Sequence, residues 1–145
     1  MTEDYFTEVA DAALGIASTE FAGGTARIRR YGVKIWFGDE PKEHYEAQVI
    51  SGAQLEIGFH SEHPKVEQNQ AVLDVLMRHE ATWRSELGDE AIAGVFLGDR
   101  TQRWRRISEV WPDEGTFEQE VAMEVGDRLA TYIVELERIR QATAN

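Results

Sequence analysis

The sequence predicts an α+β domain in which an antiparallel sheet carries helices on one face. Three segments between residues 31 and 60 alternate apolar and polar residues, which is the period of a half-buried strand. Apolar residues at helical spacing precede and follow these segments. The 145 residues suit one compact unit, so we expect a single domain over 1–145 in the order α-β-β-β-α-β-β-α.

The first helix is predicted over residues 2–20. Phe6, Val9 and Ala13 recur every three or four residues, as a buried stripe on one helix face requires. The pair Gly23-Gly24 is typical of a helix end followed by a turn, because glycine adopts conformations that other residues avoid. We therefore expect the helix to end before this pair.

Three strands are predicted next, over residues 31–37, 44–49 and 55–60. The turn between the first two contains Pro41, which fixes its own φ and cannot donate to a sheet. The alternation gives each strand one apolar and one polar face. We therefore expect a sheet that packs against helices on one side and is solvated on the other.

The alternation also restricts strand register, because a slip of one residue would move every side chain to the other face. The short turn at 51–53 is predicted to place His44 opposite His60 and Gln48 opposite Glu56 on the polar face.

The longer turn before it is predicted to place Lys34 opposite Gln48 and Trp36 opposite Glu46. Trp36 would then be a large apolar side chain on the polar face.

The second half of the chain is predicted to add two helices and one hairpin, namely a helix over 65–87, strands over 91–97 and 103–111, and a final helix from residue 117. The pattern does not identify the buried face of this hairpin. Trp104 and Val110 share one parity, whereas Ile107 and Trp111 share the other.

Charge and composition exclude several classes of function. The chain has 15 basic and 27 acidic residues, a formal net charge of −12, which repels phosphate backbones and makes nucleic-acid binding unlikely. It has no cysteine, so disulfides and thiolate sites are excluded. The acidic N-terminus lacks the features of a secretory signal, and no segment is apolar enough to cross a bilayer. We therefore expect a cytoplasmic protein without a membrane association.

Histidines and a carboxylate on the polar face form a candidate metal site. His44, Glu46, His60 and His63 are close in the predicted register, and zinc takes nitrogen and oxygen ligands of these types. The simpler interpretation is a pair of exposed histidines at the end of the sheet, since the spacing alone does not fix a complete set of ligands.

Acidic residues on the first three strands permit a second interpretation. Asp39, Glu46 and Glu56 in this element order resemble the restriction-endonuclease-like fold, whose carboxylates hold a divalent ion beside a lysine. Neither glutamate is followed by a lysine two positions later, and that charge supports the chemistry. We expect no catalytic residue, and an active nuclease is disfavoured.

Arginines gather in two places along the chain. Four of them surround Trp104 (Arg100, Arg103, Arg105 and Arg106), and a smaller group comprises Arg27, Arg29 and Arg30. Arginines beside an aromatic ring can bind a nucleic-acid strand. In so acidic a chain we expect them instead to pair with the acidic helices, for example with Glu118, Glu120 and Glu124.

Size, acidity and element order resemble the class I type III secretion chaperones, which are small acidic proteins that dimerise and bind other polypeptides. This resemblance implies a non-catalytic protein-binding or chaperone-like function, a protein partner and a homodimer, with no cofactor. Trp36 and Trp104 are the candidate exposed anchors for the partner. The alternative function is a metal-dependent hydrolase or a degraded nuclease of the restriction-endonuclease type.

Overall fold

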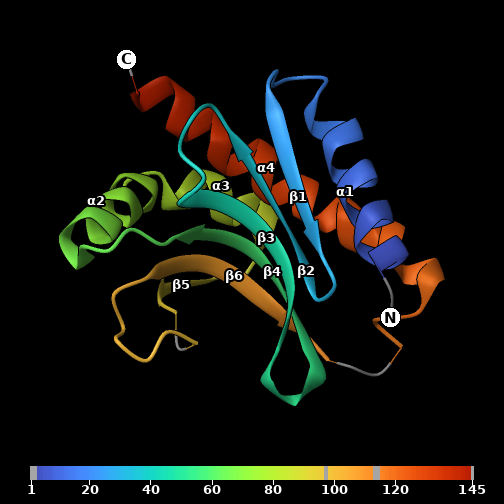
Figure 1. The fold of residues 1–145 in the computed structure, drawn as a ribbon. Helices are drawn as coiled ribbons and strands as arrows, with labels where there is room; N and C mark the ends of the chain where they lie inside the picture. Colours follow the sequence, from blue (N-terminus) through green and yellow to red (C-terminus); the bar gives the residue numbers. More distant parts are fainter. Residues whose placement is uncertain (1–2, 97, 113–114, 145) are drawn as a thin grey trace.

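The computed structural model describes residues 3–96, 98–112 and 115–144. Within them, six strands form an antiparallel sheet in the order β1-β2-β3-β4-β6-β5 (Figure 1). The strands are β1 (Gly24–Arg29), β2 (Gly32–Phe37), β3 (Glu43–Ile50), β4 (Gln54–Ser61), β5 (Ile92–Val95) and β6 (Arg105–Trp111). The helices are α1 (Glu3–Ala17), α2 (Val66–Met77), α3 (Glu80–Leu87) and α4 (Ala122–Thr143), with 3-10 turns η1 (Ser51–Ala53) and η2 (Gln119–Val121).

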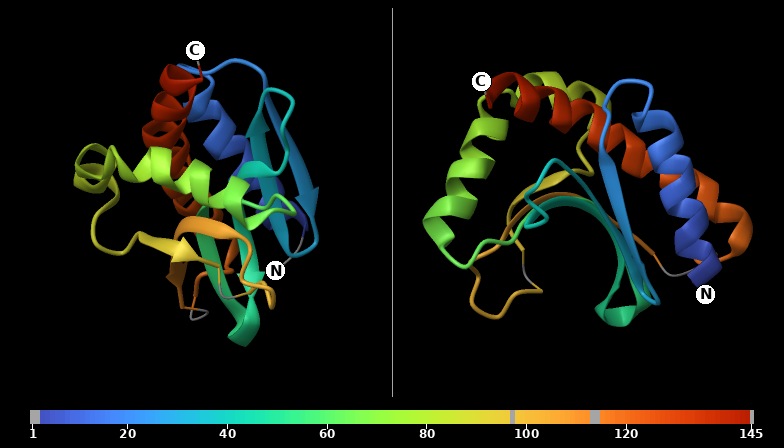
Figure 2. Two further views of the ribbon diagram at one scale, coloured as in Figure 1. Left: turned by 90° about the vertical axis from the view of Figure 1, so that its left-hand side faces the viewer. Right: turned by 45° about the horizontal axis from the view of Figure 1, so that its top comes forward.

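The sheet curves into an arch, and the helices cover its convex side (Figure 2). This arrangement confirms the predicted α+β class with helices on one face of an antiparallel sheet. The core between the two layers consists of buried apolar side chains, among them Phe6, Val9, Ile35, Ile57, Leu129 and Ile133. We call the opposite side of the arch the concave face. Gly58 lies on the concave face. A Cβ atom added there would sit 2.3 Å from the Ile107 carbonyl oxygen of β6, so the close approach of β4 and β6 requires glycine at this position.

Strand β1 is an addition to the predicted order. It pairs with β2 along its full length and forms one edge of the sheet. Most of its residues are exposed, including Ile28, so it lacks the apolar alternation by which strands are recognised in a sequence. Its arginines suit an edge strand, because exposed charges oppose pairing with another chain.

The register of β3 with β4 is confirmed, including His44 opposite His60 and Gln48 opposite Glu56. The predicted register of β2 with β3 is wrong by two residues, because Lys34, and not Trp36, lies opposite Glu46. A shift of two residues keeps every side chain on its predicted face, so the alternation of apolar and polar residues does not detect it.

The predicted helix over 65–87 is two helices, α2 and α3, separated at Arg78 and His79. His79 has φ −113° and ψ 22°, which interrupts the helical backbone. At the break, the Leu76 carbonyl accepts a 3.0 Å hydrogen bond from the His79 amide and a 2.8 Å hydrogen bond from the indole nitrogen of the buried Trp83.

The second hairpin buries the side that contains Ile107. Ile107 pairs with Phe59 and lies in the core, and Trp111 pairs with Leu55 on the same side. Trp104 belongs to the segment between β5 and β6, where its carbonyl accepts a 3.1 Å hydrogen bond from the Phe96 amide.

Across the described ranges, none of the helices combines the length and the apolar composition that a bilayer crossing requires.

Candidate functional site

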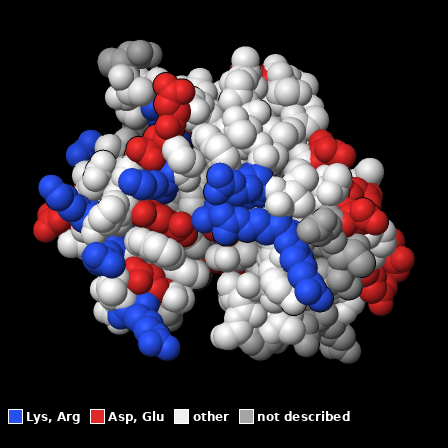
Figure 3. Space-filling view, viewed as in Figure 1, with Lys and Arg blue, Asp and Glu red and all other residues white. Residues whose placement is uncertain are grey.

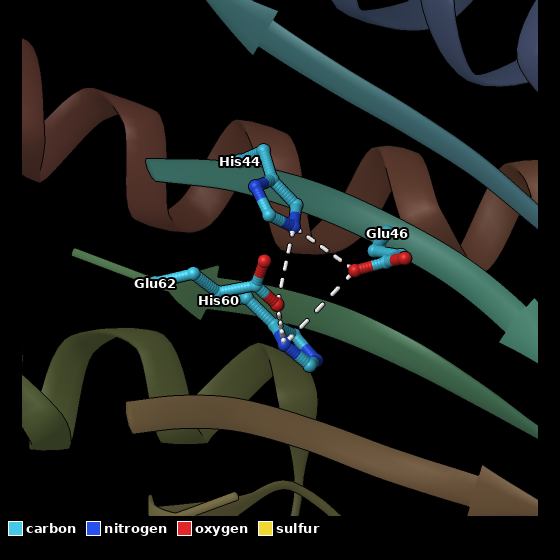
Figure 4. Close-up of side chains that lie close together, drawn as sticks. All are labelled: His44, Glu46, His60 and Glu62. Carbon is cyan, nitrogen blue, oxygen red and sulfur yellow. Dashed lines mark hydrogen bonds and ion pairs between the residues drawn. The ribbon is translucent and has the colours of Figure 1, made fainter. Parts of the chain in front are cut away.

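The candidate site is a group of four side chains on the concave face, His44, Glu46, His60 and Glu62, which we call the concave cluster (Figure 4). His44 and Glu46 are two residues apart on β3, so both point to the same face. His60 is on β4 directly opposite His44. Glu62 follows the end of β4, and its amide continues the ladder with a 2.8 Å hydrogen bond to the Lys42 carbonyl.

One nitrogen or oxygen atom from each of these residues lies within 4.8 Å of the others. His44 Nε2 is 2.9 Å from Glu46 Oε1 and 3.8 Å from Glu62 Oε2. His60 Nδ1 is 3.0 Å from Glu62 Oε2 and 4.0 Å from Glu46 Oε1. The two imidazole nitrogens and the two carboxylates therefore alternate around a common centre.

The other nitrogen of each imidazole faces an oxygen atom outside the cluster. His44 Nδ1 lies 2.9 Å from the Pro41 carbonyl, which can only accept, so this nitrogen carries the proton and donates. His60 Nε2 lies 3.0 Å from Glu56 Oε2, close enough for an ion pair although not aligned for a hydrogen bond. These contacts orient both rings and direct His44 Nε2 and His60 Nδ1 toward the centre.

Glu56 is itself held in place by two donors. Gln48 Nε2 donates to it over 2.8 Å and Ser108 Oγ over 2.7 Å. Burial alone would raise the pKa of the Glu56 carboxyl, but the charge of His60 and these hydrogen bonds lower it to about 2. Glu56 is therefore an ionised carboxylate that supports the His60 ring.

The cluster contains more acid than permanent base. Its own carboxylates, Glu46 and Glu62, and the neighbouring Glu56 surround the two imidazoles, and the amine of Lys34 forms an ion pair at 3.5 Å with Glu62. Burial would lower the pKa of His60, but the carboxylates of Glu56, Glu62 and Glu46 raise it to about 10. The arrangement therefore attracts cations, either a proton on His60 or a metal ion between the two imidazoles.

The centre of the concave face is buried, so the prediction that this side of the sheet is solvated is wrong there. His44, His60 and Glu56 are at most 1% exposed. The segment between β5 and β6 folds over them, with the Phe96 ring 4.7 Å from the His60 ring. The Phe96 ring in turn stacks on Trp104 at 6.4 Å.

The structure brings together three of the four residues predicted to bind metal, and His63 is the exception. It points to the helix side, where its Nε2 lies 2.7 Å from Glu43 Oε2. The reason is strand parity, because neighbouring residues point to opposite faces and His60 is already on the concave one. Glu62 is two residues from His60, so the same alternation places it on the concave face and could have identified it from the sequence.

The sequence also did not predict that Lys34 lies at the site, because the predicted register of β2 with β3 was wrong by two residues. The predicted pairing placed Lys34 beside Gln48, whereas the observed pairing places it beside Glu46.

The remaining candidates from the sequence lie outside the cluster. Asp39, one of the acidic residues of the nuclease interpretation, lies in an exposed turn and is not part of the cluster. Trp36 and Trp104, the candidate anchors, are both half-buried.

The prediction that the arginine groups pair with the acidic helices is wrong. Within the described part of the chain, none of the seven arginines forms an ion pair with a carboxylate within 4.0 Å. Arg105 donates to Gln70, and Arg106 donates to Ser108.

A pocket of about 440 Å³ lies beside the concave cluster, with Glu46 and Glu62 in its lining. Arg27, Arg29 and Lys34 line one part of it, and we call these three residues the basic wall. Phe96 and Trp104, which we call the aromatic wall, line another part. Lys and Arg side chains gather near the middle of the face seen in Figure 3.

Comparisons with known proteins give no match: no protein family, no curated protein and no solved structure is significantly similar to this chain.

Proposed function

We propose that the chain is a metal-binding protein whose concave cluster holds one divalent transition-metal ion. The observation that carries this proposal is the convergence of two imidazole nitrogens and two carboxylates within 4.8 Å, with both rings oriented from outside by Pro41 and Glu56. Histidine ligands in metal sites are typically oriented in this way, by a carbonyl or a carboxylate on the second nitrogen.

The set of donor atoms favours zinc. Two nitrogens and two oxygens suit a tetrahedral ion, whereas calcium and magnesium take oxygen ligands. Metal–ligand distances of about 2.0 to 2.2 Å in a tetrahedron separate neighbouring ligand atoms by about 3.4 Å. The four histidine–carboxylate separations in the cluster run from 2.9 to 4.0 Å, and all four ligand atoms lie within 4.8 Å of one another, so side-chain movements of about 1 Å give this geometry.

A site with four protein ligands is closed, which favours a role in binding over hydrolysis. We therefore assign no catalytic residue. The hydrolase alternative requires one ligand to leave so that water can bind, and Glu62 is the candidate, because it is the most exposed of the four and already contacts Lys34.

Calorimetric titration of chelator-stripped protein with Zn²⁺ tests the proposal. We expect one ion per chain, and binding at least tenfold weaker after Glu62→Gln, which keeps the shape of the side chain and removes its charge. His79→Gln is the matched control, because His79 is exposed and lies outside the cluster. Thermal unfolding of each variant verifies that it folds. A wild-type protein that binds no zinc would reject the proposal.

The protein partner, the homodimer, the anchoring role of Trp36 and Trp104 and the cytoplasmic location stay predictions from the sequence. Light scattering tests the dimer, and recovery of a partner with and without Trp36→Ala tests the anchor.

A further inference from the structure

The basic wall contains two arginines without ion-pair partners in a strongly acidic chain. Its third member, Lys34, forms the 3.5 Å ion pair with Glu62. Arg27 and Lys34 are paired across β1 and β2, and Arg29 lies on the same face two residues from Arg27. Among the described residues, the guanidinium groups of Arg27 and Arg29 have no hydrogen bond or ion pair. Guanidinium groups at a pocket match the geometry of phosphate or carboxylate, which accept two hydrogen bonds from one arginine.

The aromatic wall offers the same pocket a flat apolar surface. Trp104 and Phe96 stack nearly parallel, with 15° between their rings. The Asp99 carboxylate accepts hydrogen bonds from the amides of Thr101, Arg103 and Trp104, which fixes the segment that holds the rings. The surface is therefore formed before any ligand arrives, which lowers the entropic cost of binding.

The two walls come from opposite ends of the sheet order and line the same pocket beside the concave cluster. A volume of about 440 Å³ is within the range of small-molecule sites. The two unpaired guanidinium groups, with the Lys34 amine beside them, favour a dianion such as a phosphate monoester, and the stacked rings favour a flat ring at the other end of the ligand.

We propose that this pocket binds a small organic phosphate that carries an aromatic ring, as a mononucleotide does. The proposal rests on the metal function in one respect: Glu46 and Glu62 line the pocket, and an ion held between them would neutralise carboxylates that otherwise repel the phosphate. Zinc is therefore expected to strengthen binding of the phosphate.

The test is calorimetric titration with adenosine 5′-monophosphate, adenosine and inorganic phosphate, each in the absence and presence of zinc. We expect the monophosphate to bind at least tenfold tighter than either fragment, and tighter with zinc than without it. Equal binding of the monophosphate and inorganic phosphate would overturn the assignment of the ring. Zinc binding without any binding of the monophosphate would overturn this proposal and leave the metal site intact.

Substitutions in the two walls should change binding of the monophosphate without changing binding of zinc. Arg27→Ala with Arg29→Ala should weaken monophosphate binding by roughly 30-fold or more and leave zinc affinity unchanged. Trp104→Ala should weaken monophosphate binding about tenfold and leave inorganic phosphate unaffected. Lys65→Ala with Arg78→Ala is the control, because it also removes two positive charges, at exposed positions that do not line the pocket. Equal losses in the control and the arginine variant would overturn the proposal.

Discussion

Two groups of histidine and glutamate side chains lie back to back at the same end of the sheet, each at least half-buried. The concave cluster is one. The other, which we call the helix-side cluster, comprises Glu43, His63, Glu137 and Arg140. Glu43 and His44 are neighbours on β3, and Glu62 and His63 are neighbours after β4, so the alternation of the chain sends one of each pair to each face.

The two clusters differ in the source of positive charge. On the helix side, Arg140 of α4 reaches both carboxylates, with 2.6 Å to Glu43 and 2.9 Å to Glu137. Tyr45 donates a further 2.8 Å hydrogen bond to Glu137. On the concave side, among the described residues, the permanent cation that pairs with a carboxylate is Lys34, at 3.5 Å. The positive charge on the helix side is thus a permanent guanidinium, whereas on the concave side it comes from Lys34 and from a proton on His60, which a metal ion can displace.

The largest expected effect is a loss of folding stability when Arg140, the cation of the helix-side cluster, is removed. Arg140→Met removes the guanidinium that pairs with the buried Glu137 and the half-buried Glu43, while Tyr45 and His63 still contact these carboxylates. We therefore expect the free energy of unfolding to fall by about 3 kcal/mol, the lower end of the range for broken buried pairs. Urea denaturation measures this loss, and the difference between wild type and variant should be the same with zinc as without it, because zinc stabilises both by binding at the concave cluster. A loss below about 1 kcal/mol would show that the helix-side cluster does not depend on Arg140.

The next effect is stabilisation by the metal. At a free zinc concentration of 100 times Kd, binding to the folded state adds about 2.7 kcal/mol to the free energy of unfolding. Lower pH should reduce this gain, because protons compete with zinc for the imidazoles. Thermal unfolding at pH 7.5 and pH 5.5 measures both effects. A zinc-induced stabilisation that is equal at the two pH values would contradict ligation by histidine.

A smaller effect is expected at Glu56, which orients His60 and does not reach the centre. Glu56→Gln should weaken zinc binding by about 10- to 100-fold, the usual range for a residue that supports a ligand. Zinc titration followed by isothermal calorimetry gives the ratio. An unchanged affinity would mean that His60 keeps its orientation without the carboxylate.

The smallest effect on metal binding is expected at His63, which the sequence placed in the site and the structure places on the helix side. His63→Gln should leave zinc affinity within about twofold. It should lower the free energy of unfolding by roughly 1 kcal/mol, because the contact with Glu43 weakens. The same calorimetric titration and a urea curve provide both values. A large loss of zinc affinity would favour the original ligand set with His63.

The sequence predicted the features that strand periodicity controls. His44 faces His60 because the turn at 51–53 and the alternation of residues leave one register, and Glu46 follows by parity. Lys34 was missed because a shift of two residues is invisible to that alternation. Burial of the site was missed because Phe96 and Trp104 reach it through tertiary folding of a connecting segment, which no local pattern encodes.

Anomalous diffraction at the zinc edge, from crystals of the zinc-loaded protein, tests the central claim most directly. We expect one peak about 2.0 to 2.2 Å from His44 Nε2, from His60 Nδ1 and from an oxygen of each of Glu46 and Glu62. Zinc bound between His63 and Glu43, or no ion at the concave cluster, would contradict the account.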